Sequence, residues 1–194
     1  KKKLRRIVFN ISKIMNSKII IAIDAMGGEN APHKNIEGVS IFLNKKNKKS
    51  DVFFNLFGNE ELIKKELNKH KISNENYKIF PTTTVVSDEE TPLTAIKNSK
   101  NSSMWNSINS QITSNSNITL SAGNTGVLFV ISRMLLKTIE SVSKPALAGL
   151  WPNKKNMNVV LDLGANVECD EKNLIDFSEM GSALYKSLFP EETP

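Results

Sequence analysis

The sequence predicts an α/β fold with a mainly parallel sheet. Short apolar runs rich in β-branched or aromatic residues, such as residues 19–23 and 51–57, are typical of strands buried on both faces. Segments with helical spacing alternate with these runs through most of the chain, which is the pattern of βαβ units. We find no internal repeat, no low-complexity linker and no clear domain boundary, so we expect one domain.

The expected strands are short apolar runs that end at polar or glycine-containing turns. They cover residues 19–23, 51–57, 77–80, 117–121, 146–151 and 157–162. The expected helices show amphipathic spacing, as in EELIKKELNKH after Gly58-Asn59. They cover residues 34–43, 60–70, 105–112, 125–139 and 172–188. A further helix is expected from about Thr91, because Pro92 suits the first helical position after a polar cap.

The positive charge of the chain is confined to its first residues. The formal net charge is +6, but residues 1–14 hold six Lys/Arg and no acid, and the rest is balanced at 20 basic and 20 acidic side chains. We therefore expect a basic tail over residues 1–17 and no nucleic-acid partner. The tail is either a solvated segment or a short amphipathic arm that touches anionic lipid. Met15 is an alternative start to Lys1.

The few cysteine and histidine residues argue against a metal or disulfide framework. The chain has one cysteine, Cys169, which we expect to be a small packing residue in a protein of the reducing cytoplasm. His33 and His70 lack HxxH or HExxH spacing, so no metal site is expected. No run approaches the roughly 18 to 20 apolar residues that span a bilayer.

Three strand ends combine glycine with an acid or amide: Asp24–Gly28 (DAMGG), Ser121–Gly126 (SAGNTG) and Asp162–Asn166 (DLGAN). Glycine allows backbone amides to approach a ligand, and a following helix directs its N–H groups at the same point. Such turns suit an anion, and ligands gather at the carboxyl ends of parallel strands. Lys100, Ser102 and Ser103 add a cation and two hydroxyls, which are groups that hold phosphate.

SAGNTG also has a purely structural interpretation. Gly123 would allow a turn with positive φ, and Asn124 or Thr125 would cap the next helix without binding anything. The pattern is neither GxGxxG nor GxxxxGK[ST], so a dinucleotide or P-loop site has no direct support. The sequence alone leaves the capped turn and the anion cradle open.

Four motifs together resemble a known family. IAIDAMGGENAP at 21–32, KNSSM at 100–104, LSAGNTGVL at 120–128 and VLDLGANVECDEKNLIDFSEMGS at 160–182 are similar, in this order, to the PlsX family of bacterial phosphate acyltransferases. The resemblance covers about residues 18–189, and three such blocks in one order are specific, whereas each alone is weak. Proteins of this family continue beyond the point where this chain ends, so we expect residues 18–194 to be the N-terminal part of that domain.

The resemblance implies a fold and a function. The fold would be a three-layer α/β/α Rossmann-like structure, similar to isocitrate dehydrogenases and phosphotransacetylases. The family transfers fatty acyl groups from acyl carrier protein to inorganic phosphate, and the acyl phosphate is used by a membrane glycerol-3-phosphate acyltransferase in phospholipid synthesis. Its members are cytoplasmic homodimers, peripheral at the inner face of the membrane, and no cofactor is expected.

The same resemblance assigns roles to residues. The expected phosphate- and substrate-binding residues are Gly27, Gly28, Lys100, Ser102, Ser103, Ser121, Gly123, Thr125, Gly126 and Asp162. Asn124 or Asn166 would stabilise the oxyanion, while Asp24 and Asp162 would orient donors and backbone. Two alternatives remain open: a non-catalytic fragment of such an enzyme, and a phosphotransacetylase-type enzyme that uses acyl-coenzyme A.

Overall fold

The computed structural model describes residues 18–45, 51–87, 89, 91, 94, 97, 99–113, 115–154 and 156–191. The expected basic tail and most of the helix expected from Thr91 lie outside the described residues. The chain forms two compact units that divide between Ile131 and Ser132. Each unit has its own sheet.

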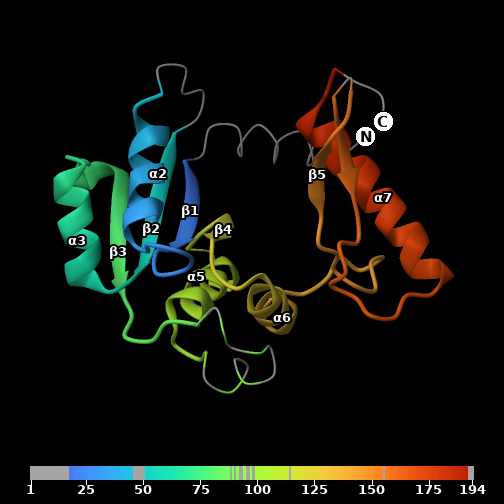
Figure 1. Cartoon of the computed structure of the whole chain (residues 1–194), viewed down its shortest axis with the longest axis horizontal. Coiled ribbons are helices and arrows are strands. Elements are labelled where there is room, and N and C mark those ends of the chain that lie inside the picture. Colours follow the sequence, from blue (N-terminus) through green and yellow to red (C-terminus); the bar gives the residue numbers. More distant parts are fainter. Residues whose placement is uncertain are drawn as a thin grey trace, which may run out of the picture. The chain divides into compact units, whose positions relative to one another are not determined.

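A four-stranded parallel sheet forms the centre of the first unit (Figure 1). Its strands are β1 (Ile19–Asp24), β2 (Val52–Gly58), β3 (Tyr77–Pro81) and β4 (Ile118–Ser121). Their spatial order is β3-β2-β1-β4, and each neighbouring pair is parallel. The chain therefore moves outward from β1 to β3 and then crosses back to the other side of β1, so the winding reverses between β1 and β4. The prediction of a mainly parallel sheet is confirmed.

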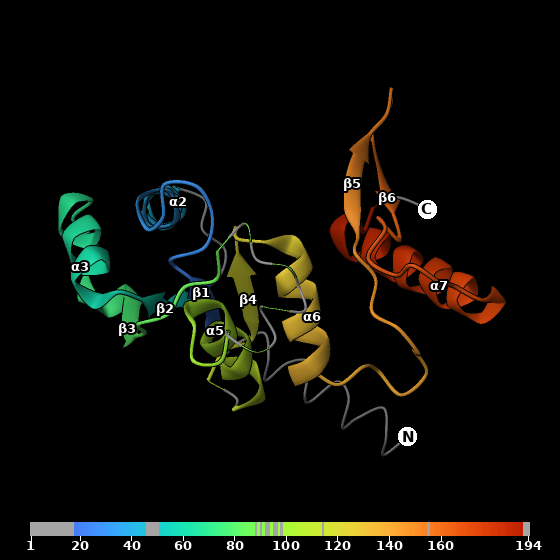
Figure 2. The same cartoon turned by 60° about the horizontal axis from the view of Figure 1, so that its bottom comes forward.

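Helices cover both faces of this sheet. The helices α2 (His33–Leu43) and α3 (Glu60–Lys69) lie on one face, and α5 (Ser103–Ile112) lies on the other (Figure 2). A short 3₁₀ turn (Asn74–Asn76) precedes β3, and α6 (Thr125–Leu135) follows β4. The arrangement is the three-layer α/β/α Rossmann-like fold that the resemblance implied.

The two faces of β1 bury different kinds of side chain. On the α2–α3 face, Ile23, Phe54, Leu56 and helical residues such as Ile36 and Ile63 form the hydrophobic core. The opposite face lies against α5, whose buried side chains include small serines as well as Met104 and Ile108. Because serine is small and can bond the helix backbone, as Ser107 Oγ does to the Met104 carbonyl at 2.8 Å, α5 approaches the strands closely.

The second unit contains an antiparallel strand pair and a long helix. β5 (Gly149–Pro152) and β6 (Met157–Val160) pair antiparallel, and α7 (Glu171–Leu188) follows. The two strands are joined by only residues 153–156, which is too short for a parallel crossover. Asp170 begins α7 with a capping box, because its side chain accepts from Asn173 N while Asn173 Oδ1 accepts from Asp170 N.

Two expected boundaries are wrong in instructive ways. The helix expected over 125–139 ends at Leu135, and Ile139 is 73% exposed, so little apolar burial is gained by extending the helix to that position. The helix expected from Trp105 begins two residues earlier, because the Ser102 hydroxyl accepts a 3.1 Å hydrogen bond from Trp105 N and caps it.

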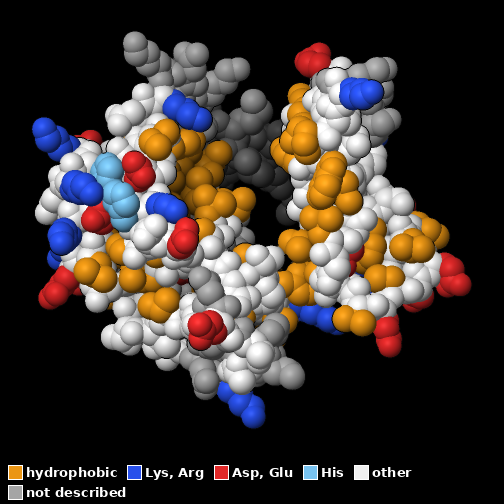
Figure 3. Space-filling model, viewed as in Figure 1, with side chains coloured by type: hydrophobic (Ala, Val, Ile, Leu, Met, Phe, Trp, Pro, Cys, Tyr) orange, Lys and Arg blue, Asp and Glu red, His pale blue; other side chains and the backbone are white. Residues whose placement is uncertain are grey.

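Several large apolar side chains of the second unit are exposed, including Trp151, Val167, Leu174 and Ile175. Figure 3 shows apolar side chains gathered on the surface of the unit that contains β5. Within the described ranges, none of the helices combines the length and the apolar character needed to cross a bilayer.

Candidate functional site

The ends of β1 and β4 are joined by side chains. Asp24 and Ser121 are aligned partners at the last position of the parallel ladder. Ser121 Oγ donates a 2.8 Å hydrogen bond to Asp24 Oδ2 and accepts a 3.1 Å hydrogen bond from Gly123 N. The DAMGG and SAGNTG turns, far apart in sequence, therefore form one structure at the carboxyl edge of the sheet.

Asp24 is a buried acid with an incomplete set of partners. Its exposed fraction is 1%, and burial raises its pKa above the usual range, although hydrogen bonding to Ser121 and the approach of Ser103 partly oppose this rise. The Ser103 hydroxyl lies near the carboxyl group without hydrogen-bond geometry: among the described residues, neither Asp24 Oδ1 nor Ser103 Oγ has a hydrogen-bond partner. Buried polar atoms of this kind are uncommon, so Asp24 Oδ1 and Ser103 Oγ are candidate partners for a ligand or a water molecule.

Glycine is required where the two turns touch. A Cβ on Gly27 would lie 2.5 Å from Asp24 Oδ2 and 3.0 Å from Gly123 N, and a Cβ on Gly28 would lie 2.6 Å from the Ala122 carbonyl oxygen. Gly28 also has a φ of 88°, which favours glycine. The expectation of positive φ at Gly123 is wrong; a Cβ there would instead lie 3.1 Å from Met104 and 3.3 Å from Gly27, so its smallness serves close packing.

The start of α5 lies beside the DAMGG and SAGNTG turns. Ser102 and Ser103 are fully buried, and the Ser103 amide donates to the Thr84 carbonyl. Met104, the next residue, is the side chain nearest to a Cβ on Gly123, so α5 begins against the SAGNTG turn. Lys100 is exposed just before the helix. The structure thus brings the KNSSM segment to the two turns, with its lysine facing solvent.

The helix α6 begins directly from the SAGNTG turn. Asn124 Oδ1 accepts a 3.1 Å hydrogen bond from Val127 N, so Asn124 is the cap and the structural interpretation of this turn is confirmed on that point. Thr125 and Gly126 are exposed in the first turn of the helix, where backbone N–H groups have no intrahelical acceptor. The same turn can therefore cap α6 through Asn124 and still expose helix N–H groups, which are suited to binding an anion.

The third turn lies in the second unit. Asp162 Oδ1 accepts from Leu147 N at 2.8 Å, and Asp162 Oδ2 accepts from Asn166 N at 2.7 Å and from Asn166 Nδ2 at 3.0 Å. Burial raises the pKa of Asp162, but the backbone amides and Asn166 outweigh it, so the pKa is lowered. Asn166 Nδ2 also donates to the Pro145 carbonyl at 2.8 Å. Both residues hold their own loop together.

Sequence reasoning missed Asn35, which organises the DAMGG turn. Asn35 Nδ2 donates to the carbonyl oxygens of Ala25 and Gly27, both at 3.0 Å. The only sequence signal was an amide side chain in the first turn of the following helix. Cys169 is a correction: it is exposed, so it is not a packing residue, because the segment before α7 lies at the surface.

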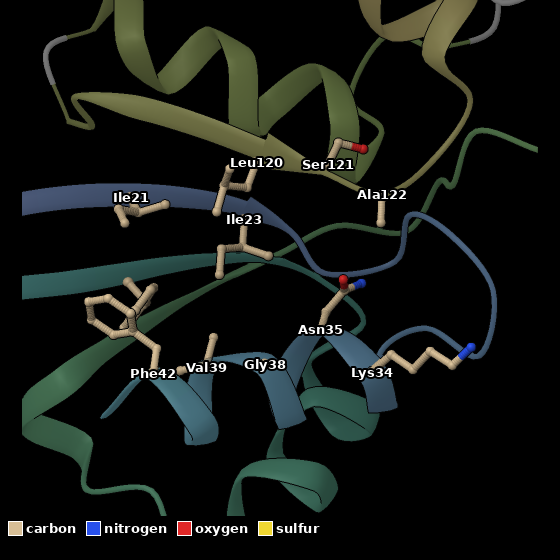
Figure 4. Close-up of a pocket in the computed structure, with 11 residues that line it drawn as sticks. Ile21, Ile23, Lys34, Asn35, Gly38, Val39, Phe42, Leu120, Ser121 and Ala122 are labelled. Carbon is tan, nitrogen blue, oxygen red and sulfur yellow. The ribbon is translucent and has the colours of Figure 1, made fainter. Parts of the chain in front are cut away.

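A groove of about 490 Å³ opens on the α2 face of the sheet (Figure 4). Apolar side chains from β1, β4 and α2 form its walls, while Lys34, Asn35, Ser121 and Ala122 line its end. Ser121 and Ala122 also belong to the turn that contacts Gly28. The groove therefore begins at the carboxyl edge, next to the DAMGG and SAGNTG turns.

These features define a class of protein: an α/β Rossmann-like protein with a candidate anion site at the point where the winding of the sheet reverses, which is where open parallel sheets bind ligands. Residues 19–194 match the family described as fatty acid synthesis protein, and the chain belongs to this family. The resemblance found in the motifs is confirmed.

Named relatives agree with this membership. The chain is 52% identical over 178 residues to the phosphate acyltransferase of Pelagibacter ubique (strain HTCC1062), covering 91% of this chain and 52% of that protein. It is 36% identical to the phosphate acyltransferase of Ehrlichia ruminantium (strain Gardel), covering 95% of this chain and 54% of the relative. The chain therefore spans about half the length of these curated relatives.

Proposed function

We propose that this chain forms the phosphate-binding part of a phosphate acyltransferase, which transfers a fatty acyl group from acyl carrier protein to inorganic phosphate. The observation that carries the proposal is the joined pair of turns: Gly123 N, Ser121 Oγ and Asp24 Oδ2 form a hydrogen-bonded chain where two helices begin. The names of the relatives supply the reaction class.

Phosphate binds against the first turn of α6, with the Thr125 and Gly126 amides as donors and Lys100 as the nearby cation. One phosphate oxygen attacks the thioester carbonyl carbon. The carbon–sulfur bond then breaks, and the thiolate leaves on the carrier protein and takes up a proton. Bound phosphate is already nucleophilic, so holding the two reactants together supplies much of the acceleration.

The oxyanion that forms at the carbonyl needs hydrogen-bond donors. We assign this role to Asn124 rather than to Asn166, because Asn124 follows Ser121 in the SAGNTG turn, whereas Asn166 lies in the loop that it holds together through the Pro145 carbonyl and Asp162. The cap orients the Asn124 side chain, because its Oδ1 is held by Val127 N, and its donor is Nδ2. Asp24 orients Ser121, and with it the SAGNTG turn, through their hydrogen bond.

The acyl chain lies in the groove that starts at Ser121 and Ala122, because its walls are apolar and its end is at the anion-binding turns. The proposed reaction implies acyl carrier protein as donor and a membrane glycerol-3-phosphate acyltransferase that consumes the acyl phosphate. Family membership is the basis for proposing a homodimer. We propose the cytoplasm, at the inner face of the membrane, as its location, because the proposed acyl donor is a carrier protein and the proposed acceptor enzyme is in the membrane.

The test is phosphate-dependent release of the carrier-protein thiol by the purified 194-residue chain. Asn124→Ser keeps a capping side chain but removes the amide donor, so we expect a loss of about 10²–10³-fold in rate with little change in stability. Asn124→Ala loses both the donor and the cap. A parental rate in Asn124→Ser removes this residue from the mechanism.

The same assay separates the alternatives. Acyl-coenzyme A as the better donor would indicate the phosphotransacetylase-type enzyme. A folded chain that forms no acyl phosphate from either thioester would show that these residues do not catalyse the reaction by themselves.

A further inference from the structure

Two helices of the first unit bring the two histidines of the chain together. His33 is the first residue of α2, and His70 directly follows α3. Their rings are stacked, with centroids 5.9 Å apart. Figure 3 shows them as one continuous patch with acidic side chains beside it.

A carboxylate lies between the two rings. Glu66 is one helical turn before His70, and its Oε2 is 2.8 Å from His33 Nδ1 and 3.9 Å from His70 Nε2. One potential ligand atom from each of the three residues can be chosen so that all lie within 4.8 Å of one another. Ligand atoms on a tetrahedral zinc ion lie about 3.3 Å apart, so small side-chain rotations bring these three into range.

The cluster has the burial and the polarity expected of a metal site. The side chains of Glu66 and His70 are only 15% and 19% exposed. His70 Nε2 is buried, and among the described residues it has no hydrogen-bond partner. In the tautomer that carries its proton on Nδ1, the lone pair of Nε2 is available to a metal ion. His33 is 41% exposed, which provides access from solvent.

A fourth residue, Glu37, lies on the other side of the His33 ring. Glu37 Oε2 is 4.0 Å from His33 Nε2, on the ring nitrogen opposite the one that faces Glu66. Histidine ligands commonly donate their second N–H to such a carboxylate, which fixes the ring and its tautomer. Lys69 Nζ, 3.7 Å from Glu66 Oε2, is the competing cation.

We propose that His33, Glu66 and His70 form a binding site for a divalent transition metal of the zinc class. Two imidazoles and one carboxylate form a known set of three protein ligands for zinc. The fourth position on the tetrahedral ion is then taken by water. The ion links the start of α2 to the end of α3. Because Asn35 in the same turn of α2 holds the DAMGG backbone, the ion also anchors the helix that supports the anion-binding turns.

The test is zinc titration of the untagged chain by calorimetry, together with cobalt absorption in the visible range. The parent is expected to bind one zinc ion per chain and to melt at a higher temperature with zinc, because binding to the folded state stabilises it. His70→Ala and His33→Ala should each lose at least about tenfold in affinity, since even outer partners of a ligand contribute tenfold or more.

Matched variants separate the cluster from other zinc ligands. Glu66→Gln removes the negative charge of the proposed carboxylate ligand. Glu61→Gln makes the same change at an exposed position of α3 and should bind zinc as the parent does. Cys169→Ser tests the exposed thiol and should also bind normally. Circular dichroism of each metal-free variant establishes that it is folded.

Absence of saturable zinc binding by the folded parent would overturn the proposal. So would unchanged affinity in both folded histidine variants, or loss of binding in Cys169→Ser alone. None of these measurements depends on acyl transfer.

Discussion

Ser121 Oγ donates a 2.8 Å hydrogen bond to Asp24 Oδ2 across 97 positions of sequence. The pair closes the parallel ladder between β1 and β4, at the point where the winding of the sheet reverses. It links the two glycine turns that, taken singly, are ordinary strand ends. The predictions that follow test this link, the groove beside it and the third turn.

Asp24→Asn should change how stability depends on pH. Because burial raises the pKa of Asp24, the folded state holds this proton more tightly than the unfolded state does. As pH rises from about 4 through the raised pKa, the free energy of unfolding of the parent should fall relative to that of the variant. The slope in this range is about 1.4 kcal/mol per pH unit. Urea unfolding of both proteins across this range measures the difference, and a constant difference would contradict the prediction.

Gly27→Ala should lower stability and, on the proposed function, the rate of phosphate-dependent thiol release. Its Cβ would lie 2.5 Å from Asp24 Oδ2 and 2.9 Å from Ser121 Oγ, so the bonded pair must move. Overpacking of this kind costs about 1–3 kcal/mol. Gly38→Ala is the matched control: no atom lies within 4 Å of its Cβ, and alanine in a helix should add about 0.5–1 kcal/mol. Equal stability of the two variants would show that the turns have room.

On the proposed function, in which the groove holds the acyl chain, Gly38→Leu should shorten the acyl chain that is accepted. Gly38 lines the groove, and its Cβ position is open, so a leucine side chain can occupy the groove without displacing the helix backbone. We expect a higher KM for acyl carrier protein that carries a long acyl chain. The KM for donors with short acyl chains and the KM for phosphate should stay the same. Unchanged use of every chain length would place the acyl chain elsewhere.

Asp162→Asn should destabilise the chain. Asp162 Oδ1 and Oδ2 accept from the Leu147 and Asn166 amides, and asparagine has only one acceptor oxygen, so a cost of about 1–3 kcal/mol is expected. Since the pKa of Asp162 is lowered, the advantage of the parent should be present above about pH 4 and be lost as pH falls further.

Asp170→Asn is the control for that substitution. Asp170 caps α7 by accepting from Asn173 N, and asparagine caps a helix about as well as aspartate. Thermal unfolding of the two variants should therefore differ, with Asp162→Asn melting lower. Equal melting temperatures would mean that the loop between β6 and α7 tolerates the lost acceptor.

The sequence predicted most of the fold because the relevant signals are local. β-Branched runs such as Ile19–Asp24 and amphipathic spacing such as Glu60–Lys69 depend only on neighbouring residues. Boundaries failed where a tertiary or capping contact decides them, as at Ser102. The helix after Asn124 ends at Leu135, and Ile139, the last apolar residue of the expected helix, is exposed, so burial does not stabilise a longer helix there.

By itself the sequence determined the α/β class, the family and the three glycine turns, because strand and helix periodicity and ordered motifs are properties of adjacent residues. Only the tertiary structure decided which side chains meet. It joined Asp24 to Ser121, used Gly123 for close packing rather than for positive φ, and brought His33 to Glu66 across 33 positions. The physical reason is that β1–β4 pairing and α2–α3 packing set these distances, and no local spacing encodes them.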